Sequence, residues 1–214
     1  MQIFQYSLGQ LQANCYFLIQ DKECLIIDPA DDASFILEEL QRRNLTLMGM
    51  FATHGHFDHV MAAGEIQKSF NVSLYVFKED MFLIDRLVQT AEHFLGYKPV
   101  IFKPINIKFL NEGELKIENC LPRKISKKFI WGKLEILSTP GHTPGSYCVY
   151  FRKENVIFTG DTLFKQGIGR YDHSYSSKKD LQSSLNKIFK LPEETIVYSG
   201  HGEQTTIKEE KGVL

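Results

Sequence analysis

Short runs of apolar, β-branched and aromatic residues recur along the chain and dominate its hydrophobic pattern. Each run is five to seven residues long and is bounded by Gly, Pro, Asp or Asn, which is typical of β-strands. The pattern predicts strands over residues 14–20, 23–28, 47–53, 73–77, 133–137, 146–151, 155–160 and 195–200.

Amphipathic helices are predicted between some of these strands, because apolar residues there recur every three or four positions. Residues 32–44 form the first helix, with Asp31 or Asp32 as its N-terminal cap. The second helix begins near His59 and continues to residue 70, and the third covers about residues 177–190. The apolar stripes of the first and third helices are Phe35, Ile36, Leu37 and Leu40, and Leu181, Leu185, Ile188 and Phe189.

Residues 79–132 have a less regular pattern. A helix is compatible with 79–95, and the remainder is expected to be an excursion that returns to the sheet at Lys133. The first half reads strand-strand-strand-helix-strand-helix-strand, and the second half reads several strands, a helix and a strand. This order favours mixed sheets covered by helices. The length of 214 residues predicts a single domain, 1–214.

Composition excludes several classes of partner. The formal net charge is -1, from 25 basic and 26 acidic residues, so electrostatic binding to nucleic acid or to an anionic membrane is not expected. No apolar run approaches the roughly 18 residues that span a bilayer. No Lys or Arg precedes Lys22, so a signal peptide is not predicted and a cytoplasmic location is expected. The cysteines at 15, 24, 120 and 148 are predicted to be buried, reduced thiols.

The segment THGHFDH, at residues 53–59, carries the strongest chemical signal. It follows directly on an apolar strand and combines imidazole and carboxylate groups, which suit zinc, manganese or iron. His54 and His56 alternate and can converge on one ion in an extended turn, whereas Asp58 and His59 are better placed for a second ion.

Three further predicted strands end on a candidate ligand: KLEILSTPGH on His142, NVIFTGD on Asp161 and TIVYSGH on His201. Ligands at four strand ends are expected to gather along one edge of the sheet, the usual location of catalytic groups. Glycines at 55, 141, 160, 200 and 202 flank them and fit tight turns. Of the remaining histidines, His93 is expected in a packed helix and His173 near a substrate loop.

Taken together, THGHFDH, TPGHTPGS, FTGDTLF and SGHGEQT resemble the motifs of the metallo-β-lactamase superfamily, in that order along the chain. The resemblance implies an α/β fold of the four-layer αββα type, with two mixed sheets and a dinuclear metal site. It assigns the first metal to His54, His56 and His142, the second to Asp58, His59 and His201, and the bridging position to Asp161.

Within the superfamily the chain resembles short, single-domain bacterial glyoxalase II (hydroxyacylglutathione hydrolase)-like proteins, on NCYFL, IIDPA, GDTLF and GIGR. This resemblance implies a thioesterase acting on a small-molecule thioester. The C-terminal helical domain that supplies much of the glutathione site in full-length glyoxalase II is expected to be absent, which leaves the thiol carrier open. Arg170 matches a basic family position that binds the thiol carrier, and Tyr171 and Lys165 are weaker candidates.

The implied mechanism uses a metal-bound hydroxide at a site with two divalent ions per chain, zinc first and iron or manganese as alternatives. The hydroxide attacks the thioester carbonyl, and a metal stabilises the oxyanion. Asp58 is the candidate catalytic residue, which orients the hydroxide. Asp28 is expected to hydrogen-bond a ligand histidine and fix its tautomer.

Two other activities remain open on the sequence. A persulfide dioxygenase-like enzyme would hold a single Fe(II) on His54, His142 and Asp161. A lactone or β-lactam hydrolase is the second alternative. The sequence predicts neither the acyl group nor the oligomeric state.

Overall fold

The computed structural model describes residues 1–116 and 133–213. It contains two six-stranded sheets and a two-stranded ribbon. The first sheet has the order β1 (Gln2–Leu8), β2 (Ala13–Gln20), β3 (Glu23–Ile27), β4 (Thr46–Phe51), β5 (Leu74–Val76) and β6 (Ile107–Phe109). The second has the order β14 (Thr205–Thr206), β13 (Ile196–Ser199), β10 (Val156–Gly160), β9 (Tyr147–Phe151), β8 (Lys133–Ser138) and β7 (Gly113–Lys116). The ribbon pairs β11 (Leu163–Phe164) with β12 (Gly167–Ile168).

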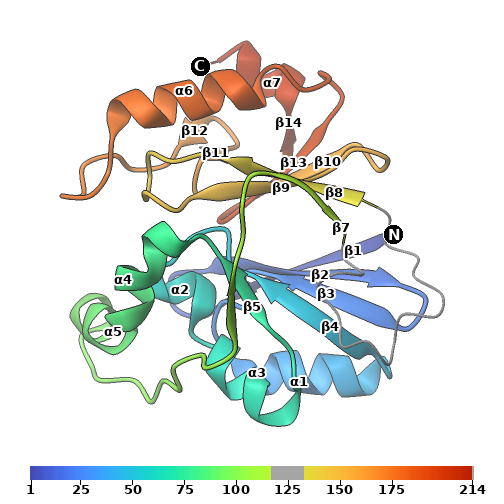
Figure 1. Cartoon of the computed structure of the whole chain (residues 1–214), viewed down its shortest axis with the longest axis vertical. Helices are drawn as coiled ribbons and strands as arrows, with labels where there is room; N and C mark the ends of the chain where they lie inside the picture. Colours follow the sequence, from blue (N-terminus) through green and yellow to red (C-terminus); the bar gives the residue numbers. More distant parts are fainter. Residues whose placement is uncertain (117–132, 214) are drawn as a thin grey trace.

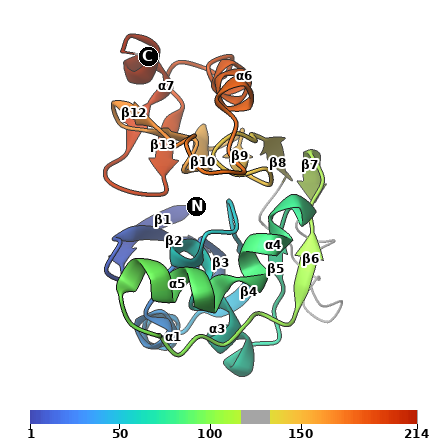
Figure 2. The same ribbon diagram turned by 90° about the vertical axis from the view of Figure 1, so that its left-hand side faces the viewer.

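Helices cover the outer faces of the two sheets, so the layers read helix, sheet, sheet, helix (Figure 1). The helices are α1 (Ala33–Arg42), α2 (Phe57–Val60), α3 (Ala63–Ser69), α4 (Met81–Asp85), α5 (Leu87–Leu95), α6 (Lys178–Ile188) and α7 (Ile207–Lys211), with a 3-10 turn η1 (Lys78–Asp80). Turning the molecule by 90° shows α6 and α7 above the second sheet, and α1 and α3 below the first (Figure 2). This is the expected αββα sandwich with two mixed sheets. Within the described ranges, no helix is both long and apolar enough to cross a bilayer.

The continuous apolar runs of the sequence arise because the strands are covered on both faces. On β2, Cys15, Phe17 and Ile19 pack toward the helices, while Tyr16 and Leu18 pack between the sheets. On β9, the residues Tyr147, Val149 and Phe151 lie in the layer between the sheets, and Cys148 and Tyr150 lie under α6. Successive side chains of a strand point to opposite faces, so a strand buried on both sides has no polar alternation.

Most of the predicted elements are present, with bounds shifted by a residue or two. Asp32 is the cap of α1, since its carboxylate accepts a hydrogen bond of 3.1 Å from the Phe35 amide. The single helix expected from His59 to residue 70 is wrong in one respect, because the chain forms α2 and α3 in its place. The segment 79–95 is likewise divided into α4 and α5. The strands β6, β7, β11, β12 and β14 and the helix α7 were not predicted, and Cys120 lies outside the described residues.

Strand direction explains why candidate ligands far apart in sequence meet. In the first sheet β3 and β4 are parallel, so Asp28 and Thr53 follow their carboxyl ends side by side. In the second sheet β10 and β13 are parallel, and β8 runs in the same direction because both it and β10 are antiparallel to β9. The loops that carry His142, Asp161 and His201 therefore leave the second sheet at one edge.

Candidate metal centre

The segments that follow four strands place seven candidate ligands in two groups. His54 and His56 follow β4, Asp58 and His59 lie on α2, and His142, Asp161 and His201 follow β8, β10 and β13. The first group is His54, His56, His142 and Asp161, and the second is Asp58, His59 and His201; within each group the ligand atoms all lie within 4.8 Å of one another. The structure thus brings together all seven predicted ligands.

The first group is tightly convergent. The Nδ1 atom of His56 lies 3.1 Å from Nε2 of His54 and 3.0 Å from Nε2 of His142. The Oδ2 atom of Asp161 lies 3.5 Å from Nε2 of His142. Three ring nitrogens and one carboxylate oxygen therefore face a common centre, in the manner of a four-coordinate site.

The second group faces the other side of Asp161. The Nε2 atoms of His59 and His201 are 3.3 Å apart, and Oδ2 of Asp58 lies 3.3 Å from Nε2 of His201. Asp161 reaches this group as well, with Oδ1 3.5 Å from Nε2 of His59 and Oδ2 3.8 Å from Nε2 of His201. Its carboxylate lies between the two groups, where the sequence places a bridging ligand.

Asp28 fixes the tautomers of two histidines. Its Oδ2 atom lies 2.9 Å from Nδ1 of His59 and accepts a hydrogen bond of 2.8 Å from the Thr53 hydroxyl. A carboxylate only accepts, so His59 carries its proton on Nδ1. Because the Thr53 hydroxyl donates its hydrogen bond to Asp28, its oxygen accepts from Nδ1 of His54 at 3.2 Å. Both rings therefore direct Nε2 toward the centre, where it is free for a metal ion once any proton on it is lost, as the sequence predicted for one ligand.

Backbone carbonyls fix two more rings. Nδ1 of His142 lies 2.9 Å from the carbonyl oxygen of Arg170, and Nδ1 of His201 lies 3.2 Å from that of Gln12. A carbonyl also only accepts, so each of these rings holds its proton on Nδ1 and has a bare Nε2 atom toward the centre.

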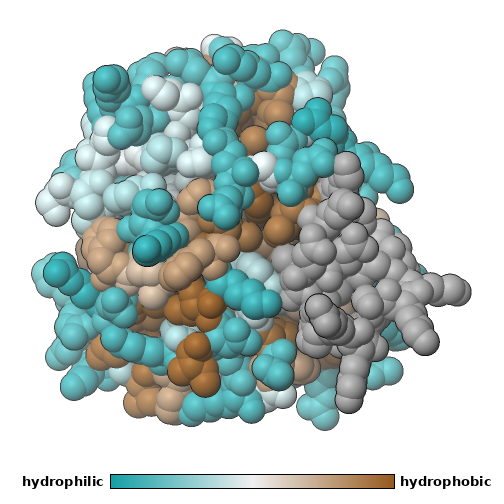
Figure 3. Space-filling view, in the orientation of Figure 1, coloured by the Kyte–Doolittle hydropathy of each residue, from teal (hydrophilic) through white to brown (hydrophobic). Residues whose placement is uncertain are grey.

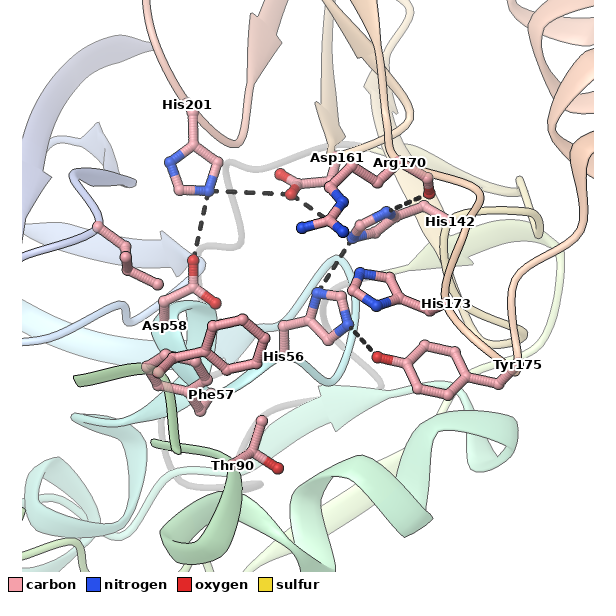
Figure 4. Close-up of a pocket in the computed structure, with 12 residues that line it drawn as sticks. His56, Phe57, Asp58, Thr90, His142, Asp161, Arg170, His173, Tyr175 and His201 are labelled. Carbon is pink, nitrogen blue, oxygen red and sulfur yellow. Dashed lines mark hydrogen bonds and ion pairs between the residues drawn. The ribbon is translucent and has the colours of Figure 1, made fainter. Parts of the chain in front are cut away.

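His56 has the opposite orientation, with Nδ1 turned inward and Nε2 2.9 Å from the Tyr175 hydroxyl (Figure 4). The ring of Tyr175 is stacked on that of His173, at a centroid distance of 5.3 Å and an interplanar angle of 14°. When the Tyr175 oxygen accepts from Nε2–H, the Nδ1 lone pair of His56 is free for a ligand bond.

A divalent metal ion fits these residues. Five imidazole nitrogens converge on the centre, and no hydrogen-bond partner among the described residues reaches the buried Oδ1 of Asp161. Buried acceptors of this kind are unfavourable unless a cation or a donor satisfies them. The nitrogen and oxygen donors suit zinc, iron or manganese.

The electrostatic field of the centre also favours a cation. Burial by itself would lower the pKa of His59, but the carboxylates of Asp58, Asp28 and Asp161 outweigh it and raise that pKa to about 10. Burial lowers the pKa of His54 well below its usual value, and the neighbouring histidines lower it further. The three carboxylates therefore stabilise positive charge at the second group, where a bound cation would take the place of the His59 proton, while burial keeps His54 neutral.

Asp80 forms hydrogen bonds to two of the ligand loops. Its role was not predicted from the sequence. Its Oδ2 accepts from the Gly55 amide at 2.8 Å and from the Thr143 hydroxyl at 2.6 Å, and its Oδ1 accepts from the Gly145 amide at 2.6 Å. Gly55 lies between the ligands His54 and His56, and Thr143 follows a ligand. One buried carboxylate therefore ties the loop of the first sheet to a loop of the second.

Two glycines make room for the bridging carboxylate. Gly160 has φ +49°, and a Cβ atom there would collide with the side chain of Thr53. A Cβ atom at Gly200 would collide with Oδ1 of Asp161 and would lie 2.8 Å from Cε1 of His59. The backbone at both positions approaches the centre too closely for any other residue.

The predicted substrate residues separate into two sets. Arg170 lines the cavity beside the centre, and its guanidinium is paired with Asp172 at 3.0 Å. Tyr171 and Lys165 lie outside the lining residues; Lys165 forms an exposed ion pair of 2.6 Å with Glu203. Their proposed roles in substrate binding stay predictions.

A cavity of about 240 Å³ opens over the two ligand groups (Figure 4). It is lined by Leu11, His56, Phe57, Asp58, Thr90, Phe94, His142, Asp161, Arg170, His173, Tyr175 and His201. A substrate bound here meets metal ligands from both groups, with α2 and α5 on one side and residues 170–175 on the other.

Solved structures with this fold are similar along nearly the whole chain. One, described as BLEG-1 B3 metallo-beta-lactamase, is 36% identical with a TM-score of 0.86, covering 99% of this chain and 97% of that one. A second, of TTHA1623 in a di-iron-bound form, is 31% identical with a TM-score of 0.84, covering 98% of each chain.

Curated relatives agree with these structures. The probable metallo-hydrolase YqgX of Bacillus subtilis is 34% identical over 206 residues, covering 95% of this chain and 92% of the relative. The hydroxyacylglutathione hydrolase GloC of Haemophilus influenzae is 36% identical over 204 residues, covering 94% and 90%. The family model of the metallo-beta-lactamase superfamily matches residues 8–201, a range that contains all seven ligand candidates. The chain therefore belongs to the metallo-beta-lactamase superfamily, and its class is that of the metallo-hydrolases.

Proposed function

We propose that the protein is a metal-dependent thioesterase of the hydroxyacylglutathione hydrolase type, which hydrolyses a small-molecule thioester. The likeness to GloC supports this substrate class, because that relative is named a hydroxyacylglutathione hydrolase. Two other hydrolase classes, for lactones and for β-lactams, share the superfamily and are outcomes of the test below.

The observation that carries the proposal is the shared carboxylate of Asp161 between two complete groups of ligands. A single-iron persulfide dioxygenase would need His54, His142 and Asp161, and the group of Asp58, His59 and His201 would have no ligand function. Two bound divalent ions supply hydroxide at neutral pH and a Lewis acid for the carbonyl oxygen.

Asp58 is the proposed catalytic residue. It lines the cavity, and its Oδ2 is held 3.3 Å from Nε2 of His201. A carboxylate in this position accepts a hydrogen bond from the attacking water and directs the oxygen lone pair toward the thioester carbonyl. The departing thiolate is a weak base, so it leaves without a general acid.

The three cysteines that the structure describes do not support covalent catalysis. Among the described residues, Cys15, Cys24 and Cys148 are free and buried. Burial raises the pKa of the Cys148 thiol to about 12 and raises the pKa of Cys15 and Cys24 as well. A thiol of such high pKa is not a nucleophile at neutral pH, which favours water as the attacking group.

The proposed resident metal is zinc, in two ions per chain. Nitrogen and oxygen ligands accept iron and manganese equally well, and occupancy follows availability as much as ligand type. The similar TTHA1623 structure holds two irons, so iron is the alternative to be measured.

Metal analysis of the purified protein, together with a substrate panel, tests the proposal. The panel contains S-lactoylglutathione, acetyl-CoA, a lactone, a β-lactam and glutathione persulfide, and oxygen consumption is recorded with the last. We expect about two ions per chain and hydrolysis of the thioesters that chelation abolishes and added metal restores. Asp58→Ala and Asp161→Ala should each lower kcat by at least about 100-fold.

Two outcomes would overturn the proposal. One is full hydrolysis by metal-stripped protein or by both aspartate variants. The other is oxygen uptake with the persulfide by a protein that holds one iron per chain. A protein that cleaves only the lactone or the β-lactam would replace the thioesterase assignment with the corresponding hydrolase.

A further inference from the structure

The cavity over the metal centre has two chemically different walls. Leu11, Phe57 and Phe94 form an apolar wall on the side of α2 and α5, with Thr90 beside them. Arg170 and His173 stand on the opposite side. In the close-up, Phe57 lies on one side of His56, and His173 and Tyr175 lie on the other (Figure 4).

We propose that the wall of Leu11, Phe57 and Phe94 is an acyl-binding site, which selects thioesters of unsubstituted apolar acyl groups longer than acetyl. This inference rests on the proposed thioesterase function. It goes beyond that function by assigning each half of the substrate to one wall of the cavity.

The side chains of this wall expose apolar surface to water, which is unfavourable in free energy. Leu11 is 40% exposed and Phe94 is 52% exposed, although the Phe94 ring is stacked on that of Phe57 at 5.8 Å and 23°. Apolar side chains are exposed elsewhere on the lower half of the molecule too (Figure 3), but Leu11 and Phe94 are those beside the ligand groups. Covering them with an acyl chain removes apolar surface from water on both partners.

The wall continues beyond the main cavity. A small recess of about 10 Å³ shares Leu11, Phe57 and Asp58 with the cavity and extends to Met61 and Leu95. Met side chains are flexible and adapt to apolar groups of different shape. The recess is about the size of one water molecule, so the end of an acyl chain that lies along Phe57 enters it only when the Met61 side chain moves aside.

The cavity volume and the charge of Arg170 indicate which half of the substrate lies inside the cavity and which half lies at its rim. The volume of about 240 Å³ is below the roughly 300–1,000 Å³ of cavities that enclose a whole drug-sized ligand. The site therefore encloses the reacting carbonyl and the acyl chain and leaves the thiol carrier at the open rim. Arg170 lies exposed at that rim. Its guanidinium can leave the ion pair with Asp172 and pair with a carboxylate of the thiol carrier.

A series of glutathione thioesters with acetyl, butanoyl and hexanoyl groups tests the inference on the metal-loaded enzyme. A fully covered methylene contributes about a fourfold gain, and butanoyl has two more methylenes than acetyl, so kcat/KM should rise by up to about 16-fold from acetyl to butanoyl. Phe94→Ala should lower the ratio of butanoyl to acetyl kcat/KM at least threefold, and Phe94→Leu should restore most of it. Phe94 is half exposed, so these substitutions leave the folded core in place.

Tyr97→Ala is the matched control. Tyr97 is 50% exposed and lies three residues after Phe94, but it does not line the cavity. The control variant should keep the wild-type ratio. A second series holds the acyl group as acetyl and lengthens an apolar thiol; its kcat/KM should respond to Phe94→Ala no more than to Tyr97→Ala.

The inference is wrong if thioesters are hydrolysed but the acyl ratio is near one, or if Phe94→Ala leaves that ratio unchanged. It is also wrong if Phe94→Ala changes kcat/KM in the thiol series and leaves the acyl series unchanged. The thiol, and not the acyl group, would then lie against the apolar wall. Absence of hydrolysis for every thioester in the series would instead overturn the proposed function.

Discussion

At the scale of single residues, the centre is defined by the outer nitrogen of each histidine. Four of these nitrogens face an acceptor whose role is fixed: Asp28, the Thr53 hydroxyl, and the carbonyls of Arg170 and Gln12. The fifth faces the Tyr175 hydroxyl, which can donate or accept. The tautomer of His56 therefore depends on a single side chain, that of Tyr175, which can be replaced by mutation.

Tyr175→Phe removes the acceptor for Nε2–H of His56, and we expect it to weaken metal binding by roughly 10-fold. The physical reason is that the imidazole loses the partner that holds its proton away from the ligand nitrogen. Competition with a chromophoric chelator measures the apparent Kd directly. Tyr171→Phe is the control, because Tyr171 lies outside the cavity. Equal affinities in wild type and Tyr175→Phe would refute this role.

At the scale of elements, a cluster of charged side chains joins the edge strand β1 to the helix α1. Between β1 and α1, the Glu39 carboxylate accepts from the Tyr6 hydroxyl at 2.8 Å and from the guanidinium groups of Arg42 and Arg43 at 2.7 and 2.8 Å. The hydrogen bonds from Arg42 and Arg43 have the largest effect on the Glu39 carboxyl, and together with that from Tyr6 they lower its pKa to about 2. The cluster holds the edge strand to the helix that covers the first sheet.

Glu39→Gln should lower the free energy of unfolding at pH 7 by about 1 kcal/mol, since solvent screens the exposed Arg42. A carboxyl with a depressed folded pKa stabilises the protein above its unfolded pKa of about 4.5 and loses that contribution as pH falls toward about 2. The difference between variant and wild type should therefore shrink below about pH 4.5. Urea unfolding at several pH values measures it.

Glu38→Gln, on the exposed side of the same helix, is the control for that comparison and should match wild type throughout. A difference between Glu39→Gln and wild type that stays constant from pH 7 to pH 3 would show that the carboxylate charge is not the origin of the effect.

At the scale of the whole molecule, the metal centre joins the two sheets. His54, His56, Asp58 and His59 belong to the first half of the chain, and His142, Asp161 and His201 to the second. Bound ions therefore stabilise the packing of one sheet on the other, in addition to their chemical function.

Removal of metal should lower the unfolding temperature of the protein. Ions at about 1,000 times their Kd stabilise the native state by about 4 kcal/mol, which corresponds to a shift of roughly 10 °C for a chain of this length. Scanning calorimetry before and after chelation measures it, and added zinc should restore the original value. A chelated sample, free of metal by elemental analysis but with unchanged unfolding temperature, would contradict this link between the sheets.

Local patterns sufficed for much of the fold and for the ligands. The apolar runs predicted the central strands, because strands covered on both faces must be apolar throughout. The dense spacing of THGHFDH, and the repetition of a ligand after each of three further strands, predicted the seven ligands. The short strands β11, β12 and β14 have only two residues each, too few to leave a pattern.

What the sequence by itself determined is the central strands, the first and third predicted helices and the ligand types, since all of these depend on residues close together in the chain. Only the tertiary structure decided the partners of those ligands and the shape of the cavity. Asp80 contacts Gly55, 25 residues before it, and Thr143, 63 residues after it, and Tyr175 contacts His56 across 119 residues. Phe94 lines the cavity because α5 packs beside α2. Such contacts arise from the packing of two sheets and their helices, and no local spacing encodes them.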